Sequence, residues 1–149
     1  MLDVLFKGKR KDNGEWIEGY LVKWINPLTL IPKFLILTQE EQISGITGEP
    51  TGHLKTEMSW YEVDPLSVGQ FTGLTDKNNK KIFESDIVSC KTTAYFFRKC
   101  KVVYRNSLAR YCIVDGNGLM FPMEGCFEYE IIGNIFDNPE LFERSYDHG

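Results

Sequence analysis

A basic segment between residues 87 and 114 is the part of the chain best suited to contact anions. It contains no Asp or Glu, and its basic residues are Lys91, Arg98, Lys99, Lys101, Arg105 and Arg110. Aromatic residues are interleaved with them at Tyr95, Phe96, Phe97 and Tyr104. Because lysine and arginine neutralise phosphates and aromatic rings stack on bases, one interpretation of this segment is a nucleic-acid groove.

The acidic segment that follows supports a second interpretation. Residues 115–149 contain eight acids and a single basic residue, Arg144. Opposite charges can pair across neighbouring strands, or the two surfaces can meet between the subunits of an oligomer. We favour these two interpretations over a nucleic-acid groove, because the chain has a net charge of −4 and aromatic residues of strands usually fill a core.

Four acids could in principle form a metal site or an acid–base cluster: Asp76, Glu84, Asp86 and Asp115. Each lies in or beside an expected turn, where carboxylates commonly accept backbone hydrogen bonds, so we predict turn roles for them. Neither His53 nor His148 has a partner at a spacing typical of catalysis. The sequence has no nucleophile elbow, phosphate-binding glycine loop or His-Glu-x-x-His motif. We therefore expect a protein that is not an enzyme, with no catalytic, metal or cofactor site.

The four cysteines are spaced too widely for a common metal motif. They lie at positions 90, 100, 112 and 126, with no Cys-x-x-Cys pair and no nearby histidine. Zinc sites usually pair two close ligands on one turn. The beginning of the chain lacks the features of an export signal, so an oxidising compartment is not indicated. We expect buried, reduced thiols in or beside strands.

Strand patterns dominate the chain. Residues 16–25 alternate so that Trp16, Tyr20, Val22 and Trp24 share one face. Shorter runs of strand type cover residues 2–6, 34–37, 60–63, 86–91, 95–104, 110–114, 119–121 and 127–132, and turn residues separate them. Many short strands favour a mainly β fold, either a small barrel or a sandwich. We expect Trp16, Trp24 and Trp60 to lie in the core or in a subunit interface.

Two further segments have distinct patterns. Residues 38–58 lose apolar periodicity and contain Gly45, Gly48, Pro50 and Gly52, which predicts a long polar loop. Residues 68–88 consist of two apolar runs around the turn Asp-Lys-Asn-Asn at 76–79, which predicts a β-hairpin. Near the end, Asn138 is a candidate N-cap with Pro139 at the first helical position, so a helical turn ending near residue 143 is expected.

Three blocks of this sequence resemble the YopX family of phage and prophage proteins. They are residues 6–10 with 13–19, residues 68–88 and residues 127–141. The family usually has glycine where this chain has Asn79 and Ser85. The resemblance implies an SH3-like β-barrel in the C-terminal half. It supplies no catalytic or binding residues, because the biochemical role of the family is not established.

These observations together predict an N-terminal β region at residues 1–64 with a loop at 38–58, an SH3-like barrel at 65–143 and a tail at 144–149. No apolar run reaches the roughly 18 residues of a membrane span. We expect a protein of the bacterial cytoplasm: a phage-encoded, non-enzymatic β module that forms a homo-oligomer and binds a host or phage protein. The alternative is a nucleic-acid-binding accessory protein that uses the basic segment at 91–110.

Overall fold

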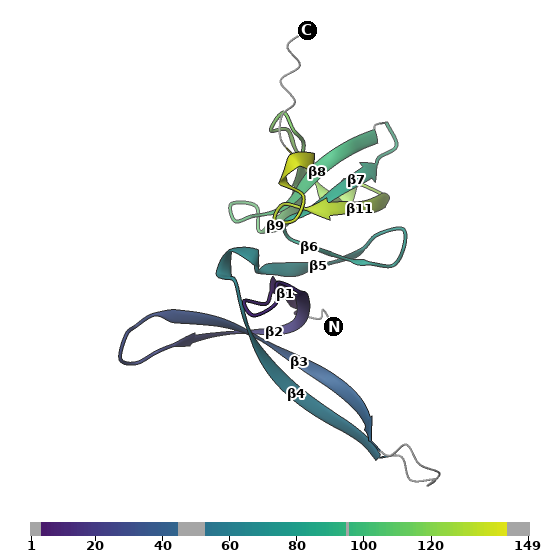
Figure 1. Cartoon of the computed structure of the whole chain (residues 1–149). Helices are drawn as coiled ribbons and strands as arrows, with labels where there is room; N and C mark the ends of the chain where they lie inside the picture. The colour runs from purple at the N-terminus through teal and green to yellow at the C-terminus, as the bar shows by residue number, and fades with distance from the viewer. Residues whose placement is uncertain (1–3, 45–52, 95, 143–149) are drawn as a thin grey trace. The chain divides into compact units, whose positions relative to one another are not determined.

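The computed structural model describes residues 4–44, 53–94 and 96–142, and it is mainly β-structure with antiparallel strand pairs (Figure 1). The chain divides into two compact units, with the boundary in the sequence between Val68 and Gly69. We call Val4–Val68 the N-terminal unit and the part from Gly69 onward the C-terminal unit.

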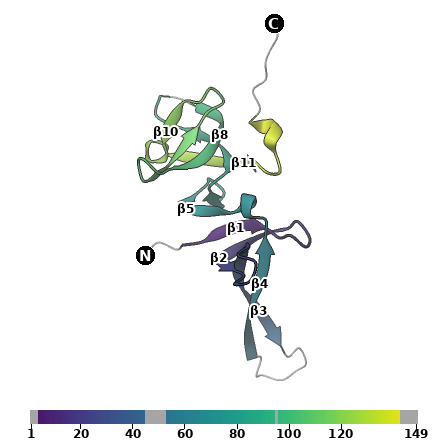
Figure 2. The same ribbon diagram turned by 90° about the vertical axis from the view of Figure 1, so that its left-hand side faces the viewer.

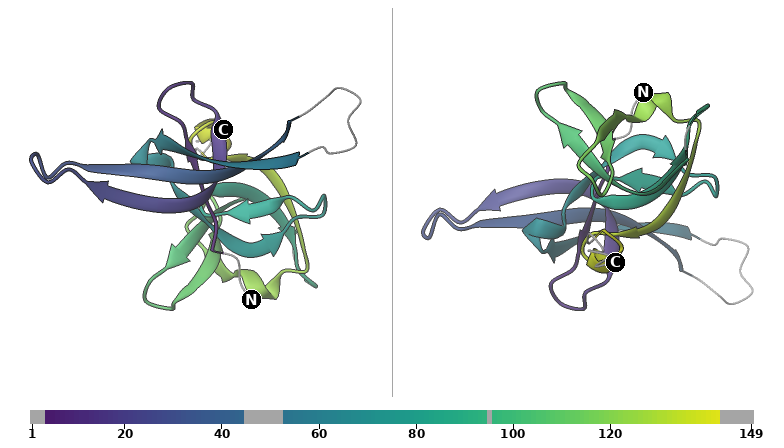
Figure 3. Two further views of the ribbon diagram at one scale, coloured as in Figure 1. Left: turned by 90° about the horizontal axis from the view of Figure 1, so that it is seen from below. Right: turned by 90° about the horizontal axis from the view of Figure 1, so that it is seen from above.

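The N-terminal unit contributes four neighbouring strands, in the order β4-β3-β2-β1, to a six-stranded sheet. Its elements are β1 (Phe6–Lys9), β2 (Trp16–Ile25), β3 (Pro32–Ser44), β4 (His53–Val63) and the 3₁₀ helix η1 (Pro65–Ser67). The register places Tyr20 opposite Leu37, and Leu37 opposite Trp60. Figure 3 shows the long ribbon that β3 and β4 form.

The prediction of a long loop over residues 38–58 is wrong for most of its length. Strand β3 continues to Ser44 and β4 begins at His53, and the two pair without interruption from Thr38↔Ser59 to Ser44↔His53. Alternation of apolar residues indicates that one face of a strand is buried. The hydrogen bonds that pair two strands join backbone groups, so they form without any apolar side chain. The middle of the expected loop, residues 45–52, lies outside the described residues.

Two glycines allow close packing in this sheet. Ile36 and Val63 are fully buried, and a Cβ atom on Gly8 would lie 3.0 Å from Cβ of Val63. A Cβ atom on Gly19 would collide with the carbonyl oxygen of Leu37. Glycine at position 19 is therefore required by the close approach of the neighbouring backbone.

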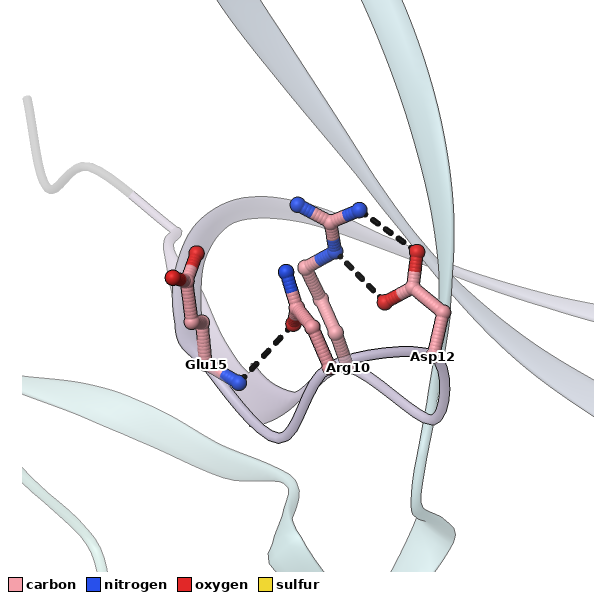
Figure 4. A network of polar contacts seen from close by, with 4 residues as sticks. Arg10, Asp12 and Glu15 are labelled. Carbon is pink, nitrogen blue, oxygen red and sulfur yellow. Dashed lines mark hydrogen bonds and ion pairs between the residues drawn. The ribbon is translucent and has the colours of Figure 1, made fainter.

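A turn at residues 11–14 joins β1 to β2, and Gly14 adopts φ +72° there. Figure 4 shows the contacts of this turn. The Arg10 guanidinium donates to both carboxylate oxygens of Asp12, at 2.9 and 2.6 Å. This hydrogen-bonded pair lowers the pKa of Asp12 and raises that of Arg10. The guanidinium also lies 4.0 Å from the centre of the Tyr61 ring, which ties the turn to β4.

The C-terminal unit contains a hairpin and a five-stranded sheet. The hairpin is β5 (Gly69–Thr75) with β6 (Lys81–Phe83). The sheet has the order β10-β9-β8-β7-β11, and β8, β10 and β11 are visible in Figure 2. Its strands are β7 (Asp86–Lys91), β8 (Phe96–Arg105), β9 (Arg110–Val114), β10 (Met120–Pro122) and β11 (Glu128–Asn134). The core consists of Ile82, Val88, Cys90, Cys100, Val102, Ile113, Met123 and Tyr129.

Both positions where the family usually has glycine adopt the left-handed backbone. The φ angle is +62° at Asn79 and +74° at Ser85. Asn79 closes the hairpin turn with a hydrogen bond from its N–H to the Asp76 carbonyl at 3.0 Å. Ser85 occupies the turn between β6 and β7, where its N–H donates to the Val102 carbonyl at 2.8 Å. Glycine is thus usual in the family at two positions where the backbone has a positive φ angle, a conformation that glycine adopts without strain.

Two 3₁₀ helices complete this unit, η2 (Met123–Gly125) and η3 (Pro139–Leu141). Pro139 lies at the start of η3, as expected, but the Asn138 side chain does not cap it. Instead the side-chain oxygen of Asn138 accepts a hydrogen bond from the Asn134 N–H at 3.3 Å. A Cβ atom on Gly133 would lie only 2.5 Å from that oxygen, so this contact depends on glycine. The tail at residues 144–149 lies outside the described residues.

Candidate interaction surface

The structure disperses the six residues of the basic segment over three strands. Lys91 ends β7, Arg98, Lys99, Lys101 and Arg105 lie on β8, and Arg110 begins β9. Alternation along β8 places residues 99, 101 and 105 on the face opposite the buried Cys100 and Val102. The side chain of Arg98 lies outside the described part of the structure.

Two of the six basic residues pair with acids of the following segment. The Lys91 ammonium lies 2.9 Å from a Glu128 carboxylate oxygen across the β7–β11 pair. The Arg110 guanidinium lies 2.6 Å from Glu124. The hydrogen bond from Lys91 also lowers the pKa of Glu128. These contacts match the interpretation in which acidic and basic strands neighbour each other. The basic residues of β8, which include Lys99, Lys101 and Arg105, are not part of these two ion pairs.

Three of the four candidate acids hold turns by accepting backbone hydrogen bonds, as predicted. Asp76 accepts from the N–H groups of Asn78 and Lys80. The Asp86 carboxylate accepts from the Phe83 N–H at 2.8 Å, and Asp115 accepts from residues 117 and 119. Their carboxylates are therefore occupied by backbone groups.

Glu84 is the exception among the four. Burial raises its pKa, and a hydrogen bond from the Tyr104 backbone offsets part of that rise. The four acids do not converge. Within residues 4–44, 53–94 and 96–142, no group of three or more His, Cys, Asp or Glu side chains is placed to hold a metal ion.

The most unusual surface of the N-terminal unit is an apolar face of its sheet. Side chains that are directly opposite in an antiparallel pair lie on the same face. The register therefore brings together one set of side chains, which we call the apolar face: Tyr20, Val22 and Trp24 of β2, Leu35 and Leu37 of β3, and Met58 and Trp60 of β4.

Much of the apolar face is exposed. The exposed fractions are 58% for Tyr20, 44% for Trp24, 57% for Met58 and 52% for Trp60. A tryptophan or tyrosine side chain buries roughly 150–250 Å² when it is fully covered, so the three half-exposed rings alone leave roughly 300 Å² open. The largest apolar patch of a typical monomer covers about 300–600 Å² and is often functional.

Charged residues border the apolar face at one end. Lys33 lies opposite Trp24, and Glu62 lies opposite Leu35. The Glu62 carboxylate also binds the Lys11 ammonium at 3.0 Å. Beside Trp60, a shallow cavity of about 310 Å³ is lined by Lys11, Asp12, Trp60, Tyr61 and Glu62.

The sequence predicted part of this surface and missed its exposure. Alternation correctly placed Tyr20, Val22 and Trp24 on one face of a strand. Trp24 and Trp60 do not lie in a core, so for them the other expected place, a subunit interface, stays a prediction. The partly buried Trp16 lies under the ammonium groups of two lysines. The signal available in the sequence is that both alternating sets of β2 are apolar.

Comparison with known proteins decides the family. The sequence model of the YopX protein family matches residues 32–143, which is more than half of the chain. This chain belongs to the YopX family. The YopX match includes the blocks at 68–88 and 127–141, and it begins after the block at 6–19. The apolar face is thus divided, since β2 precedes the YopX match and β3 and β4 lie within it.

A solved structure has a similar fold. The crystal structure of protein EF1440 from Enterococcus faecalis aligns with a TM-score of 0.55 and 24% sequence identity, over 96% of this chain and 100% of that one. At that identity the similarity concerns the fold alone. No curated protein matches the chain. In the described part of the chain, no helix is long and apolar enough to cross a membrane.

Proposed function

We propose that this YopX protein is a non-enzymatic β module, encoded by a phage or prophage, that self-associates through the apolar face and binds a protein partner. The observation that carries the proposal is the exposure of Tyr20, Trp24, Met58 and Trp60 on a single sheet face. Aromatic residues of this kind dominate the binding energy of protein interfaces. Covering them would remove apolar surface from water, which is the main driving force of association.

A second copy of the chain suits this face better than a charged ligand. The apolar side chains at the centre of the face are bordered by charges of both signs, since Lys33 and Glu62 lie opposite members of the face and Glu18 lies beside Tyr20 on the same face of β2. Around a twofold axis the same patch meets itself, so Lys33 of one copy can lie near Glu62 of the other. Such a pairing would bury apolar rings, while Glu62 could keep its ion pair with Lys11 of the same copy.

We propose further that the sheet β10-β9-β8-β7-β11 corresponds to the SH3-like barrel of the family, with η3 as its closing helical turn. The tight turns at Ser85 and Asn79 and the short strands support this assignment. We place the protein in the bacterial cytoplasm. The four free thiols are consistent with such a reducing environment.

Sedimentation velocity of the full chain over a range of concentrations tests self-association. We expect a discrete oligomer for the natural sequence, and a monomer for Trp24→Glu and Trp60→Glu. Leu66→Glu is the matched control, because Leu66 is exposed in the same unit but lies in η1, away from the apolar face. Since all three side chains are exposed, thermal unfolding should change little.

A strict monomer at the highest soluble concentration would contradict the self-association proposal. A specific host or phage protein that displaces the second copy, and is lost with Trp60→Glu, would assign the face to a partner instead. A bound small molecule that co-purifies and is chemically converted would contradict the non-enzymatic role.

Nucleic-acid binding is the second candidate function. It is favoured by the row Lys99, Lys101 and Arg105 on one face of β8, and by Arg110 directly opposite Arg105. Binding of single-stranded DNA or RNA should then weaken steeply with salt. Charge reversal at Arg98, Lys99 and Lys101 should abolish it, whereas Lys23→Glu in the other unit should not. Undetectable or salt-insensitive binding would exclude this function.

A further inference from the structure

Two of the four thiols are nearly in bonding position. The sulfur atoms of Cys90 and Cys126 lie 3.1 Å apart, and a disulfide requires about 2.05 Å. Cys90 is 1% exposed on β7, whereas Cys126, which follows η2, is partly exposed. No described residue separates the two sulfur atoms at this distance.

The backbone holds both cysteines in place. Cys90 lies opposite Tyr129 in the β7–β11 ladder. The N–H of Phe127 donates to the Lys91 carbonyl at 3.1 Å, and the N–H of Cys126 donates to the Met123 carbonyl at 3.1 Å. The Tyr129 hydroxyl donates to the same Met123 carbonyl. Closing the remaining distance therefore requires side-chain adjustment and no change of strand pairing.

We propose that Cys90 and Cys126 are a redox modification site, which forms an intramolecular disulfide when the chain meets a peroxide. In the first step the Cys126 thiol loses its proton, and the resulting thiolate attacks a peroxide oxygen. This breaks the O–O bond and gives a sulfenic acid and hydroxide, which takes up the proton released by Cys126 as the first water. In the second step the Cys90 sulfur attacks the Cys126 sulfur and expels hydroxide, which takes up the Cys90 proton as a second water. Two thiols are thereby oxidised by two electrons, and hydrogen peroxide is reduced to two waters.

The surroundings assign the order of these steps. A peroxide reaches Cys126 more readily, because Cys90 is buried. Burial and the neighbouring Cys126 also raise the pKa of Cys90, which makes it a poor first nucleophile. The remaining thiols provide comparisons, since Cys100 and Cys112 are buried on neighbouring strands. Burial raises the pKa of Cys100 to about 12.

The disulfide would connect β7 to the segment that leads into β11. It would close a loop of 36 residues that includes β8, β9 and β10. Such a cross-link restricts the unfolded chain, so we expect it to raise the midpoint of thermal unfolding by about 5–15 °C. A thiol reductant would reverse it. This site does not depend on the proposed self-association.

The test uses the full chain treated with hydrogen peroxide, followed by alkylation of free thiols, digestion and mass spectrometry. We expect a peptide pair that joins Cys90 to Cys126, two mass units lighter than the separate peptides. Reduction should remove it together with the gain in thermal stability. Cys126→Ser and Cys90→Ser should lose the product, and Cys112→Ser, which removes a buried thiol of β9, should keep it.

Several results would overturn the proposal. The first is oxidation of Cys126 to sulfinic acid without any disulfide, and the second is a disulfide between Cys90 and Cys100. The third is a folded chain in which all four thiols can still be alkylated after a peroxide treatment that oxidises the urea-unfolded chain. If a serine variant fails to fold, the peptide map of the natural sequence decides the question alone.

Discussion

One carboxylate oxygen of Asp76 accepts a hydrogen bond from the backbone N–H of Ile131, 55 residues further along the chain, at 3.2 Å. The other oxygen accepts from two N–H groups of its own turn. The next residue, Lys77, donates its N–H to the Tyr129 carbonyl at 2.8 Å. The tip of the β5–β6 hairpin is therefore bound to β11, an edge strand of the five-stranded sheet. This relationship gives the first two predictions.

Replacing Asp76 with asparagine should destabilise the C-terminal unit. The amide has one acceptor oxygen, so its NH₂ group would face a backbone N–H in a buried position. We expect a loss of about 1–3 kcal/mol in urea unfolding with an unchanged m-value. Asp115→Asn is the control, because Asp115 accepts only within its own turn. Equal losses in the two variants would contradict a special role for Asp76.

Asp76 should also make stability depend on pH. Burial alone would raise its pKa, but hydrogen bonds from the N–H groups of Lys80, Ile131 and Asn78 hold it below the usual value of 3.8. The folded state thus binds the proton more weakly than the unfolded state. The stabilisation is present above the unfolded-state pKa of about 3.9 and is lost as pH falls through the lower folded value. The stability difference between the natural chain and Asp76→Asn should shrink over that range, and a constant difference would refute the linkage.

Ser85→Gly should stabilise the protein. Ser85 has a positive φ angle, which is strained for a residue with a side chain and relaxed for glycine. We expect a gain of about 0.5–1 kcal/mol in chemical unfolding, after the larger entropy of glycine in the unfolded chain is subtracted. Asn79→Gly should gain less, because asparagine tolerates this conformation. A destabilised Ser85→Gly would mean that the serine side chain makes a contact worth more than the strain.

Gly19→Ala should be strongly destabilising, since its Cβ atom would collide with the Leu37 carbonyl oxygen in the N-terminal sheet. We expect a loss of about 2–4 kcal/mol. Gly116→Ala is the matched control, because a Cβ atom there meets nothing within 4 Å. Thermal unfolding of both variants measures the difference, and similar midpoints would show that the sheet can relax around position 19.

The ion pair between Lys91 and Glu128 should contribute little to stability, although its atoms are 2.9 Å apart. Both side chains are more than a third exposed, so water and salt screen the attraction. A double-mutant cycle with alanine should give a coupling energy of about 0–1 kcal/mol that falls with added salt. A larger, salt-independent coupling would indicate that the pair is shielded from solvent.

The sequence predicted those parts of the fold in which residue type and backbone conformation are directly linked. The alternation of residues 16–25 coincides with β2, and the runs at 86–91 and 110–114 coincide with β7 and β9. The turn roles of Asp76, Asp86 and Asp115 followed from the preference of carboxylates for backbone N–H groups. These are local effects, and they need no knowledge of the tertiary packing.

The predictions that failed depended on tertiary structure: which strand pairs with which, and which side chains are covered. The ribbon of β3 and β4 was missed because its ladder extends where apolar alternation stops. A core was one of the two places expected for Trp24 and Trp60, because large aromatic residues are usually buried, and the sequence does not reveal that about half of each side chain is exposed. The proximity of Cys90 and Cys126 was invisible as well, since it depends on the β7–β11 register.

The close approach at Gly19 also has a consequence for how the chain finds its alignment. Both alternating sets of β2 are apolar, with Tyr20 and Val22 on one face and Leu21 on the other. A slip of β2 by one residue against β3 would exchange one apolar set for another, so hydrophobicity alone discriminates weakly between the two pairings. Only the native alignment places a residue without a side chain against the Leu37 carbonyl. The native alignment of β2 and β3 is therefore favoured by a steric requirement at one position, where any other residue of β2 would bring a Cβ atom against the Leu37 carbonyl.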